Sequence, residues 1–278
     1  MDRWGPARPA HRQADVDTGP GVTDTRRTTA GRPGADAAGP RGAAGVESAH
    51  RAVGVGGARG AVGVGGGRAV VEVWWARVGA ARDGFVGDLD SVERGRLAAY
   101  VREVDRARFL LGVTITRRAL GRRFSLLAAS VSLDRTCTEC GKPHGKVRAE
   151  GVELSVTHSG DLVGVAFGER PVGLDVEKVD AGVDVDGVAR VALSADDVRA
   201  LAEYDGIAKA RAFTAYWTRR EAVLKATGEG LRGELRGPVP AGIQVQELDV
   251  GADHRAALAV VSAEPPVVRI EDATQLLS

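Results

Sequence analysis

The chain has 278 residues and a formal net charge of +1, with 4% aromatic and 27% charged residues. This balance gives no reason to expect nucleic acid or a membrane surface as a partner, and no apolar run is long enough to span a bilayer. No apolar stretch follows the first basic residues, so we expect no secretory signal. Cys137 and Cys140 are the only cysteines, too few for a disulfide framework, which favours the reducing cytoplasm.

Residues 1–69 differ in composition from the rest of the chain. They are rich in Gly, Arg, Ala, Pro and Thr, and "AVGVGG" occurs at 52–57 and again at 61–66. Such a segment buries too little apolar surface to offset its chain entropy, so we expect a disordered extension. A basic tail that binds nucleic acid is the alternative, but several acidic residues dilute its charge.

Order is expected from about Ala69 onward. Runs of β-branched and aromatic residues predict strands, and apolar residues every three to four positions predict helices. The predicted strands are 69–79, 152–160, 162–168, 172–179, 243–250 and 256–263, and the predicted helices are 90–121 (one or two helices), 193–204 and 208–230. Ser194 suits an N-cap, and Gly228 suits the position just after a helix. We therefore expect an α+β protein with two ordered parts, 70–171 and 172–278.

The stretch "VGLDVEKVD" (172–180) reads as a buried strand that carries two carboxylates. Residues two apart on a strand face the same side, so Asp175 and Glu177 project side by side, about 6–7 Å apart. Two such charges repel each other unless something positive lies between them, and Mg²⁺ takes oxygen ligands from one or two carboxylates plus phosphate. The alternative is a solvated face of an edge strand.

The stretch "YWTRREAVLKATGEGL" (216–231) predicts a helix with a polar face. Trp217, Glu221 and Lys225 are spaced four apart and share that face. Glu221 could serve as a third metal ligand or a general base, and Lys225 could meet a phosphate as a point charge. The alternative is an ordinary Glu-to-Lys pair on a helix surface.

Two further stretches combine polar side chains with turns. "VTHSGD" (156–161) follows an apolar run, and Thr157 and His158 with the turn's backbone N–H groups could cradle an anion. A plain turn is the alternative. In "CTECGKPHGK" (137–146), Lys142 lies in a Gly-Lys-Pro turn that could present it to a phosphate; otherwise it is a surface lysine.

Taken together, these stretches resemble the 4′-phosphopantetheinyl transferases of the surfactin-synthetase-activating type. That family carries a G-[ILV]-D-[ILV]-E strand and, some forty residues later, W-[ST]-x-[KR]-E-[AS]-x-x-K; here they stand as "GLDVE" (173–177) and "WTRREAVLK" (217–225). "CGKPHGK", "VTHSG" and "DRARFLLG" (105–112) resemble the family's upstream segments. The resemblance runs from about residue 70 to 260. Thr157 replaces the commoner serine, and Arg220 the commoner lysine.

The resemblance implies transfer of 4′-phosphopantetheine from coenzyme A to a serine of an acyl or peptidyl carrier protein, with Mg²⁺, releasing 3′,5′-ADP. It also implies a fold: a pseudo-dimer of two similar α/β halves in one chain, with coenzyme A between them. A chain that holds both halves is expected to be a monomer. Which carrier it would serve, in fatty acid, polyketide or nonribosomal peptide synthesis, the sequence does not decide.

The resemblance also implies roles for residues. Asp175, Glu177 and Glu221 would hold Mg²⁺ against the pyrophosphate. Glu221, or Glu177 through a water, would take the serine proton, and Lys225 would stabilise the leaving phosphate. Positions that match contacts to coenzyme A phosphates are Arg96, Arg108, Lys142, Thr157 and His158. The four arginines of "TRRALGRR" (116–123) could face an acidic carrier, or form a solvated helix face.

Two other functions are compatible with the residues. A metal-dependent phosphohydrolase could use the same carboxylates on coenzyme A or a nucleotide. A non-enzymatic zinc or nucleic-acid binding module could use Cys137, Cys140 and His144 with the arginine-rich N-terminus, although a fourth zinc ligand is missing.

Overall fold

The structure is a computed structural model, and it describes residues 68–137, 140–143, 145–228 and 236–278. The predicted N-terminal extension lies outside the described residues except for 68 and 69, and so does His144 of the zinc hypothesis. The strands are β1 (Val70–Arg77), β2 (Glu153–Ser159), β3 (Leu162–Gly168), β4 (Val172–Lys178), β5 (Ile243–Leu248), β6 (His254–Val261) and β7 (Val267–Asp272). The helices are α1 (Ser91–Ala99), α2 (Glu103–Phe124), α3 (Val185–Ala192), α4 (Ala195–Leu201), α5 (Gly206–Thr227) and α6 (Thr274–Leu277). Short 3₁₀ segments occupy Val78–Ala80, Asp83–Asp88 and Ala128–Ser130.

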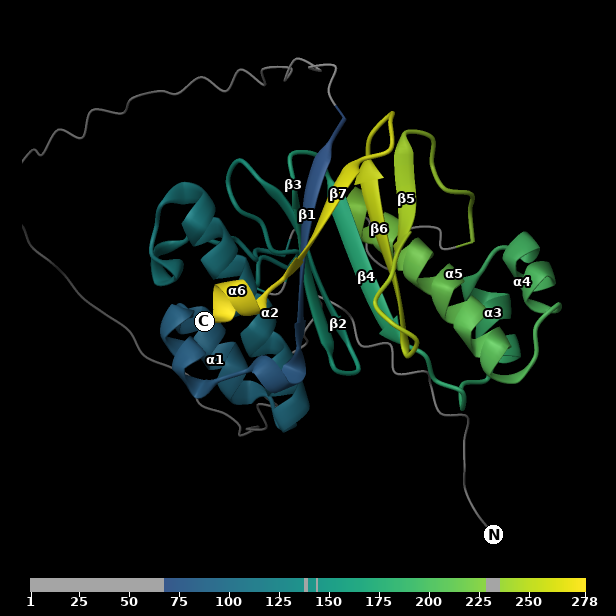
Figure 1. Ribbon diagram of the computed structural model, residues 1–278, viewed down its shortest axis with the longest axis horizontal. Coiled ribbons are helices and arrows are strands. Elements are labelled where there is room, and N and C mark those ends of the chain that lie inside the picture. The colour runs from purple at the N-terminus through teal and green to yellow at the C-terminus, as the bar shows by residue number, and fades with distance from the viewer. Residues whose placement is uncertain (1–67, 138–139, 144, 229–235) are drawn as a thin grey trace, which may run out of the picture. The chain divides into compact units, whose positions relative to one another are not determined.

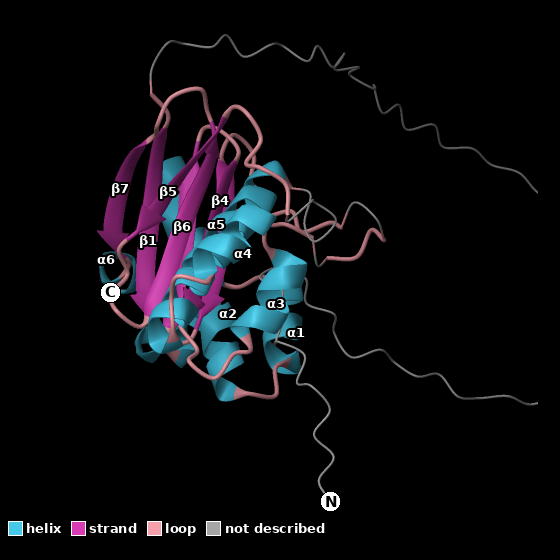
Figure 2. Cartoon of the chain, turned by 90° about the vertical axis from the view of Figure 1, so that its right-hand side faces the viewer, coloured by secondary structure: helices cyan, strands magenta, loops and turns pink. Residues whose placement is uncertain are grey.

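The strands form two sheets, with the order β2-β3-β1-β7 in the first and β4-β6-β5 in the second (Figures 1 and 2). All pairs are antiparallel except β1 and β7, which run parallel. The six predicted strands are confirmed. The seventh, β7, is new, and it joins the sheet of the N-terminal part through a bond from Val267 N–H to Ala69 O. The sequence boundary at 171/172 therefore does not separate the two sheets.

The two longest helices, α2 and α5, each have 22 residues and cover opposite outer faces of the sheets (Figure 1). Apolar residues of α2 pack on β2 and β3, while α5 packs on β4 and β6 through small residues such as Ala222 and Ala226. The inner faces of the two sheets share a core that includes Val73, Leu174 and Leu258. The sequence predicted these helices because both carry strong local signals.

The ends of the predicted helices follow the expected local chemistry. The stretch 90–121 is two helices, α1 and α2, because the chain is extended at Tyr100 and at Arg102. Ser194 caps α4 by accepting a hydrogen bond from Asp197 N–H, as predicted. Gly228 ends α5 with a φ of 77°, in the left-handed region that glycine adopts without strain. No helix among the described residues is both long enough and apolar enough to cross a membrane.

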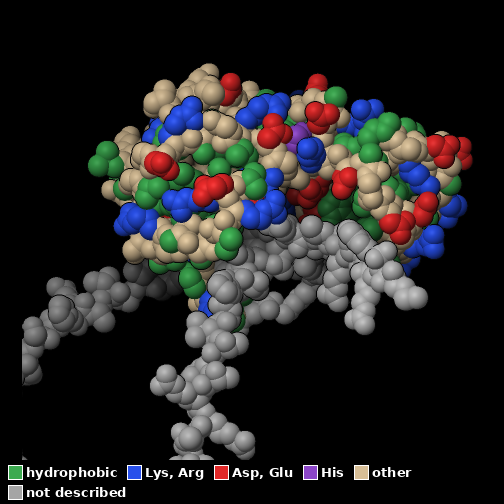
Figure 3. Space-filling view, turned by 90° about the horizontal axis from the view of Figure 1, so that it is seen from below, with side chains coloured by type: hydrophobic (Ala, Val, Ile, Leu, Met, Phe, Trp, Pro, Cys, Tyr) green, Lys and Arg blue, Asp and Glu red, His purple; other side chains and the backbone are tan. Residues whose placement is uncertain are grey.

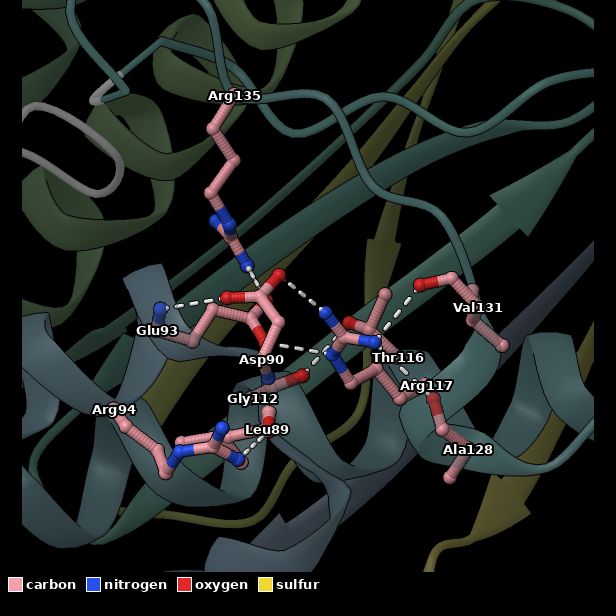
Figure 4. Close-up of polar contacts among 10 residues, drawn as sticks. All are labelled: Leu89, Asp90, Glu93, Arg94, Gly112, Thr116, Arg117, Ala128, Val131 and Arg135. Atoms are coloured by element: carbon pink, nitrogen blue, oxygen red, sulfur yellow. Dashed lines mark hydrogen bonds and ion pairs between the residues drawn. The ribbon is translucent and has the colours of Figure 1, made fainter.

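A buried ion-pair network holds α1, α2 and the following loop together (Figure 4). Arg117, 1% exposed, pairs with Glu93 and Asp90 at 2.6 Å each and donates to the carbonyls of Ala128 and Val131. Asp90 also caps α1 in a capping box with Glu93. Arg135 approaches the second oxygen of Glu93 at 3.5 Å, which ties the next loop to the network.

The buried Arg117 contradicts both hypotheses for 116–123, namely that its four arginines face a partner and that they form a solvated helix face. Arg117 points into the core because it lies on the face of α2 that packs inward, where two carboxylates offset its charge. Arg118 pairs with Asp88 and donates to the carbonyl of Leu276, and Arg122 donates to that of Gln275. These two side chains anchor α6.

Candidate active site

The glycine of "GLDVE" determines how closely α5 approaches β4. Gly173, Asp175 and Glu177 alternate along β4 and face α5, whereas Leu174 and Val176 face the core between the sheets. A Cβ at Gly173 would lie 1.9 Å from the carbonyl oxygen of Ala222 and 2.5 Å from the nitrogen of Ala226. Only a residue without a side chain permits this contact, so Gly173 brings the helix backbone onto the strand.

This close approach places Lys225 of α5 on Asp175 of β4. The Lys225 Nζ donates to Asp175 Oδ1 at 2.9 Å and to the carbonyl of Leu174 at 3.1 Å. The Asp175 side chain is buried, at 3% exposure, and that of Lys225 is partly buried, at 11%. Asp175 Oδ2 is buried without a hydrogen-bond partner. A buried carboxylate oxygen without a donor is costly, and it is a position where a cation would be stabilised.

The three predicted carboxylates act on one another electrostatically. Burial, and then the charge of Asp175, raise the pKa of Glu177 to about 7 and that of Glu221 to about 7. Burial also raises the pKa of Asp175, against the opposing effect of the Lys225 ammonium. The site therefore concentrates negative charge in a region of low dielectric, and it stabilises positive charge.

The carboxylates are near one another but not arranged as ligands. Across the ranges that the structure describes, no group of three or more His, Cys, Asp or Glu side chains is set to hold a metal ion. Lys225 occupies one side of Asp175, and the hydroxyl of Ser159 donates to Glu177 Oε2 at 2.6 Å. Figure 3 shows acidic side chains set back from the surface near the middle of one face, with lysine and arginine side chains beside them.

Thr157, predicted to contact a coenzyme A phosphate, is buried at 1% exposure. Its hydroxyl accepts a hydrogen bond from Val176 N–H at 3.1 Å and donates to Asp175 Oδ1 at 3.3 Å. The structure thus brings Thr157 to the predicted metal-binding carboxylates, with its hydroxyl already engaged. His158, the next residue on β2, is half-buried.

The other predicted phosphate contacts lie in the N-terminal part. Arg108 donates through Nε to the carbonyl of Gly160 at 2.9 Å and through Nη1 to Asp105 at 2.8 Å. Arg96 lies over the ring of Phe109 and reaches the carbonyl of Pro143 at 3.4 Å. Arg96 is therefore beside the turn that carries the exposed Lys142, while Arg108 holds the β2–β3 turn.

Sequence reasoning missed Ser159 and Lys146. The ammonium of Lys146 donates to the carbonyl of Lys225 at 2.8 Å, joining the N-terminal part to the end of α5. The hydroxyl of Ser159 donates a hydrogen bond to Glu177 Oε2. A signal for Ser159 was present, since Ser155, Thr157 and Ser159 place a hydroxyl at every second position of a strand.

Comparison with known proteins finds similarity to phosphopantetheinyl transferases. Residues 171–262 match the family model described as the 4′-phosphopantetheinyl transferase superfamily. The chain is 29% identical over 146 residues to the 4′-phosphopantetheinyl transferase HetI of Nostoc sp., covering 51% of this chain and 61% of that protein. It is 28% identical over 198 residues to a phosphopantetheinyl transferase of Thraustochytrium sp., covering 64% and 68%. It is 24% identical over 147 residues to the 4′-phosphopantetheinyl transferase Sfp of Bacillus subtilis, covering 53% and 63%. The matched parts thus span between about three fifths and two thirds of the length of these relatives.

Proposed function

We propose that this chain, whose residues 171–262 carry a domain of the 4′-phosphopantetheinyl transferase superfamily, transfers 4′-phosphopantetheine from coenzyme A to a serine of an apo acyl or peptidyl carrier protein. The serine oxygen attacks the phosphorus that bears pantetheine, and the bond from that phosphorus to the bridging oxygen breaks. The serine proton passes to a base, and 3′,5′-ADP leaves. The observation that carries the proposal is the cluster of the buried Asp175 with the half-buried Glu177, Glu221 and Lys225 at the contact of β4 with α5.

The three carboxylates are suited to two roles, as a general base and as ligands of a cation. Burial makes Glu221 and Glu177 stronger bases than free carboxylates by raising their pKa values in the metal-free site, and a bound Mg²⁺ would lower them; Glu221, or Glu177 acting through a water, is the general base of the proposal. The partnerless Asp175 Oδ2 and the mutual repulsion of the three side chains fit Mg²⁺ held by Asp175, Glu177 and Glu221. Bound there, Mg²⁺ would neutralise charge on the pyrophosphate.

Basic residues complete the proposed site. Lys225 stabilises the charge that develops on the leaving phosphate, because its ammonium already lies among the carboxylates. Arg96, Arg108, Lys142 and His158 bind the phosphates of coenzyme A. Arg108 would first have to release the Gly160 carbonyl, whereas Lys142 is exposed. Thr157 acts through Asp175.

We also propose a pseudo-dimer in which residues 70–171 and 172–278 are two similar halves, with β7 of the second half added to the sheet of the first. Each half contributes one 22-residue helix that covers a sheet, and Lys146 links the halves beside the site. With both halves in one chain, the protein acts as a monomer, and two cysteines in 278 residues fit a cytoplasmic enzyme. The carboxylates would also suit a phosphohydrolase, but the comparisons do not favour it.

A mass assay tests the function. Purified protein with Mg²⁺ and coenzyme A should add one phosphopantetheine mass to apo carrier proteins from fatty acid, polyketide and nonribosomal peptide systems. Asp175→Ala should abolish the addition while the far-UV circular dichroism stays unchanged. Full activity of Asp175→Ala would remove the metal assignment, and release of free phosphopantetheine without carrier would favour the phosphohydrolase.

A further inference from the structure

Strands β2 and β4 belong to different sheets but are joined by side-chain hydroxyls. Ser155 Oγ accepts a hydrogen bond from Leu174 N–H at 3.0 Å, and Thr157 Oγ1 accepts one from Val176 N–H at 3.1 Å. Ser159 Oγ accepts one from Lys178 N–H at 3.1 Å. Each pair is 19 residues apart in the sequence, so the two strands run parallel along this seam. The N–H groups on this edge of β4 are thus satisfied by three hydroxyls.

Two of the three hydroxyls also contact the carboxylates. A hydroxyl carries one donor and two acceptor positions, so an oxygen that accepts from an N–H can still donate its hydrogen. Ser159 donates to Glu177 Oε2 at 2.6 Å, and Thr157 donates to Asp175 Oδ1 at 3.3 Å. In the described part of the chain, Ser155 has no such carboxylate partner, although it occupies the same row of β2.

Resting on the proposed transferase function, we propose that Thr157 and Ser159 are positioning residues that each hold one oxygen of Asp175 or Glu177, so that only the other oxygens need to move to bind a divalent cation, whereas Ser155 only joins the sheets. The β4 backbone holds each hydroxyl oxygen in place, and each hydroxyl in turn holds one carboxylate oxygen. The second oxygen of Asp175, Oδ2, is buried without a hydrogen-bond partner and is available for the ion. Losing a hydrogen bond that a neighbouring residue donates to a metal ligand typically weakens metal binding by about 10- to 100-fold.

The test compares Ser159→Ala, Thr157→Val and the matched control Ser155→Ala. Each variant removes one acceptor for a β4 N–H, so all three should lower the melting temperature to a similar degree. Binding of Mn²⁺ alone to the purified protein, followed by the electron paramagnetic resonance of free Mn²⁺, should weaken by about 10-fold or more in Ser159→Ala and Thr157→Val. Ser155→Ala should bind Mn²⁺ as the wild type does, and Ser159→Thr, which keeps the hydroxyl, should restore binding.

The outcomes separate this inference from the proposed function. If all three variants weaken Mn²⁺ binding equally, or none does, the positioning role is overturned, even where the wild type transfers phosphopantetheine. If Mn²⁺ binding follows the expected pattern but no carrier is modified, the positioning role stands and the transferase proposal fails. A wild type that binds no Mn²⁺ overturns the positioning role. Should Ser159→Ala not fold, Ser159→Cys, a weak donor of similar size, replaces it with the same expected loss.

Discussion

Replacing Gly173 with alanine adds one methyl group at the point where α5 crosses β4. The new Cβ would lie 1.9 Å from the Ala222 carbonyl oxygen, and real Cβ atoms do not come closer than 3.0 Å to such atoms. The two nearest atoms are backbone atoms in the last turns of α5, so no side chain can rotate away to make room. The helix must therefore retreat by about 1 Å, which leaves the small residues between α5 and β6 imperfectly packed.

We expect this retreat to affect both stability and activity. Overpacking of this kind costs about 1–3 kcal/mol of unfolding free energy. The retreat also draws Lys225 away from Asp175, which it contacts at 2.9 Å, and a 1 Å misplacement in a catalytic group can lower the rate by about 100-fold. Urea denaturation measures the first effect, and carrier modification measured as kcat/KM measures the second.

A second glycine supplies the control. Gly95 lies on α1, and a Cβ added there would have nothing within 4 Å, so Gly95→Ala should leave activity unchanged. It should also stabilise the protein by about 0.5–1 kcal/mol, because alanine favours a helix over glycine. If Gly173→Ala is as stable and as active as the wild type, the close approach of α5 to β4 does not hold in solution, and the explanation of the glycine is refuted.

Buried charges lead to three more predictions. Lys225→Met removes the cation that lowers the pKa of Asp175, so burial should leave the Asp175 carboxyl protonated at neutral pH. Infrared difference spectra between Lys225→Met and the double variant Lys225→Met/Asp175→Asn would show the band of this protonated carboxyl. The band of an ionised carboxylate would contradict the prediction. The pKa values of Glu177 and Glu221, about 7 against 4.5 when unfolded, mean that the metal-free fold binds more protons than the unfolded chain. Its unfolding free energy should therefore fall as pH rises from about 4.5 through 7, and replacing both residues with glutamine should flatten that slope in urea melts. Arg117→Met removes the close cation from the buried Glu93, which then keeps only Arg135 at 3.5 Å, and should cost up to about 3–5 kcal/mol in urea denaturation, a loss that a surface charge pair would not produce.

Local sequence signals were enough for most of the secondary structure, and their failures have a physical reason. The helix α5 was predicted to within a few residues because its apolar spacing and Gly228 both act locally. The edge strand β7 was missed because it is short and largely exposed on both faces, so it carries no alternating pattern. Its partner is β1, at the other end of the described residues, and no local feature of Val267–Asp272 encodes that pairing.

The candidate site was predictable in its residue types but not in its contacts. Asp175, Glu177 and Glu221 were chosen from motifs, and the structure shows that they influence one another. The partners of Thr157 and Arg108 could not be foreseen, because a hydroxyl or a guanidinium pairs with whatever tertiary packing places nearby. For Arg108 that partner is the Gly160 carbonyl, and for Thr157 it is the backbone and carboxylate of β4.

The seam between the sheets links the fold to the chemistry. The edge of β4 presents N–H groups that must be satisfied, and a neighbouring strand could pair them through its backbone at about 4.8 Å spacing. Such a ladder would satisfy Leu174, Val176 and Lys178, but it would supply no hydrogen for Asp175 or Glu177. Hydroxyls on β2 satisfy the same groups and still donate to the carboxylates beside them. The alternating hydroxyls of β2 and the alternating carboxylates of β4 are therefore best understood as one structural unit, in which the joint between the two sheets also orients the acidic side chains.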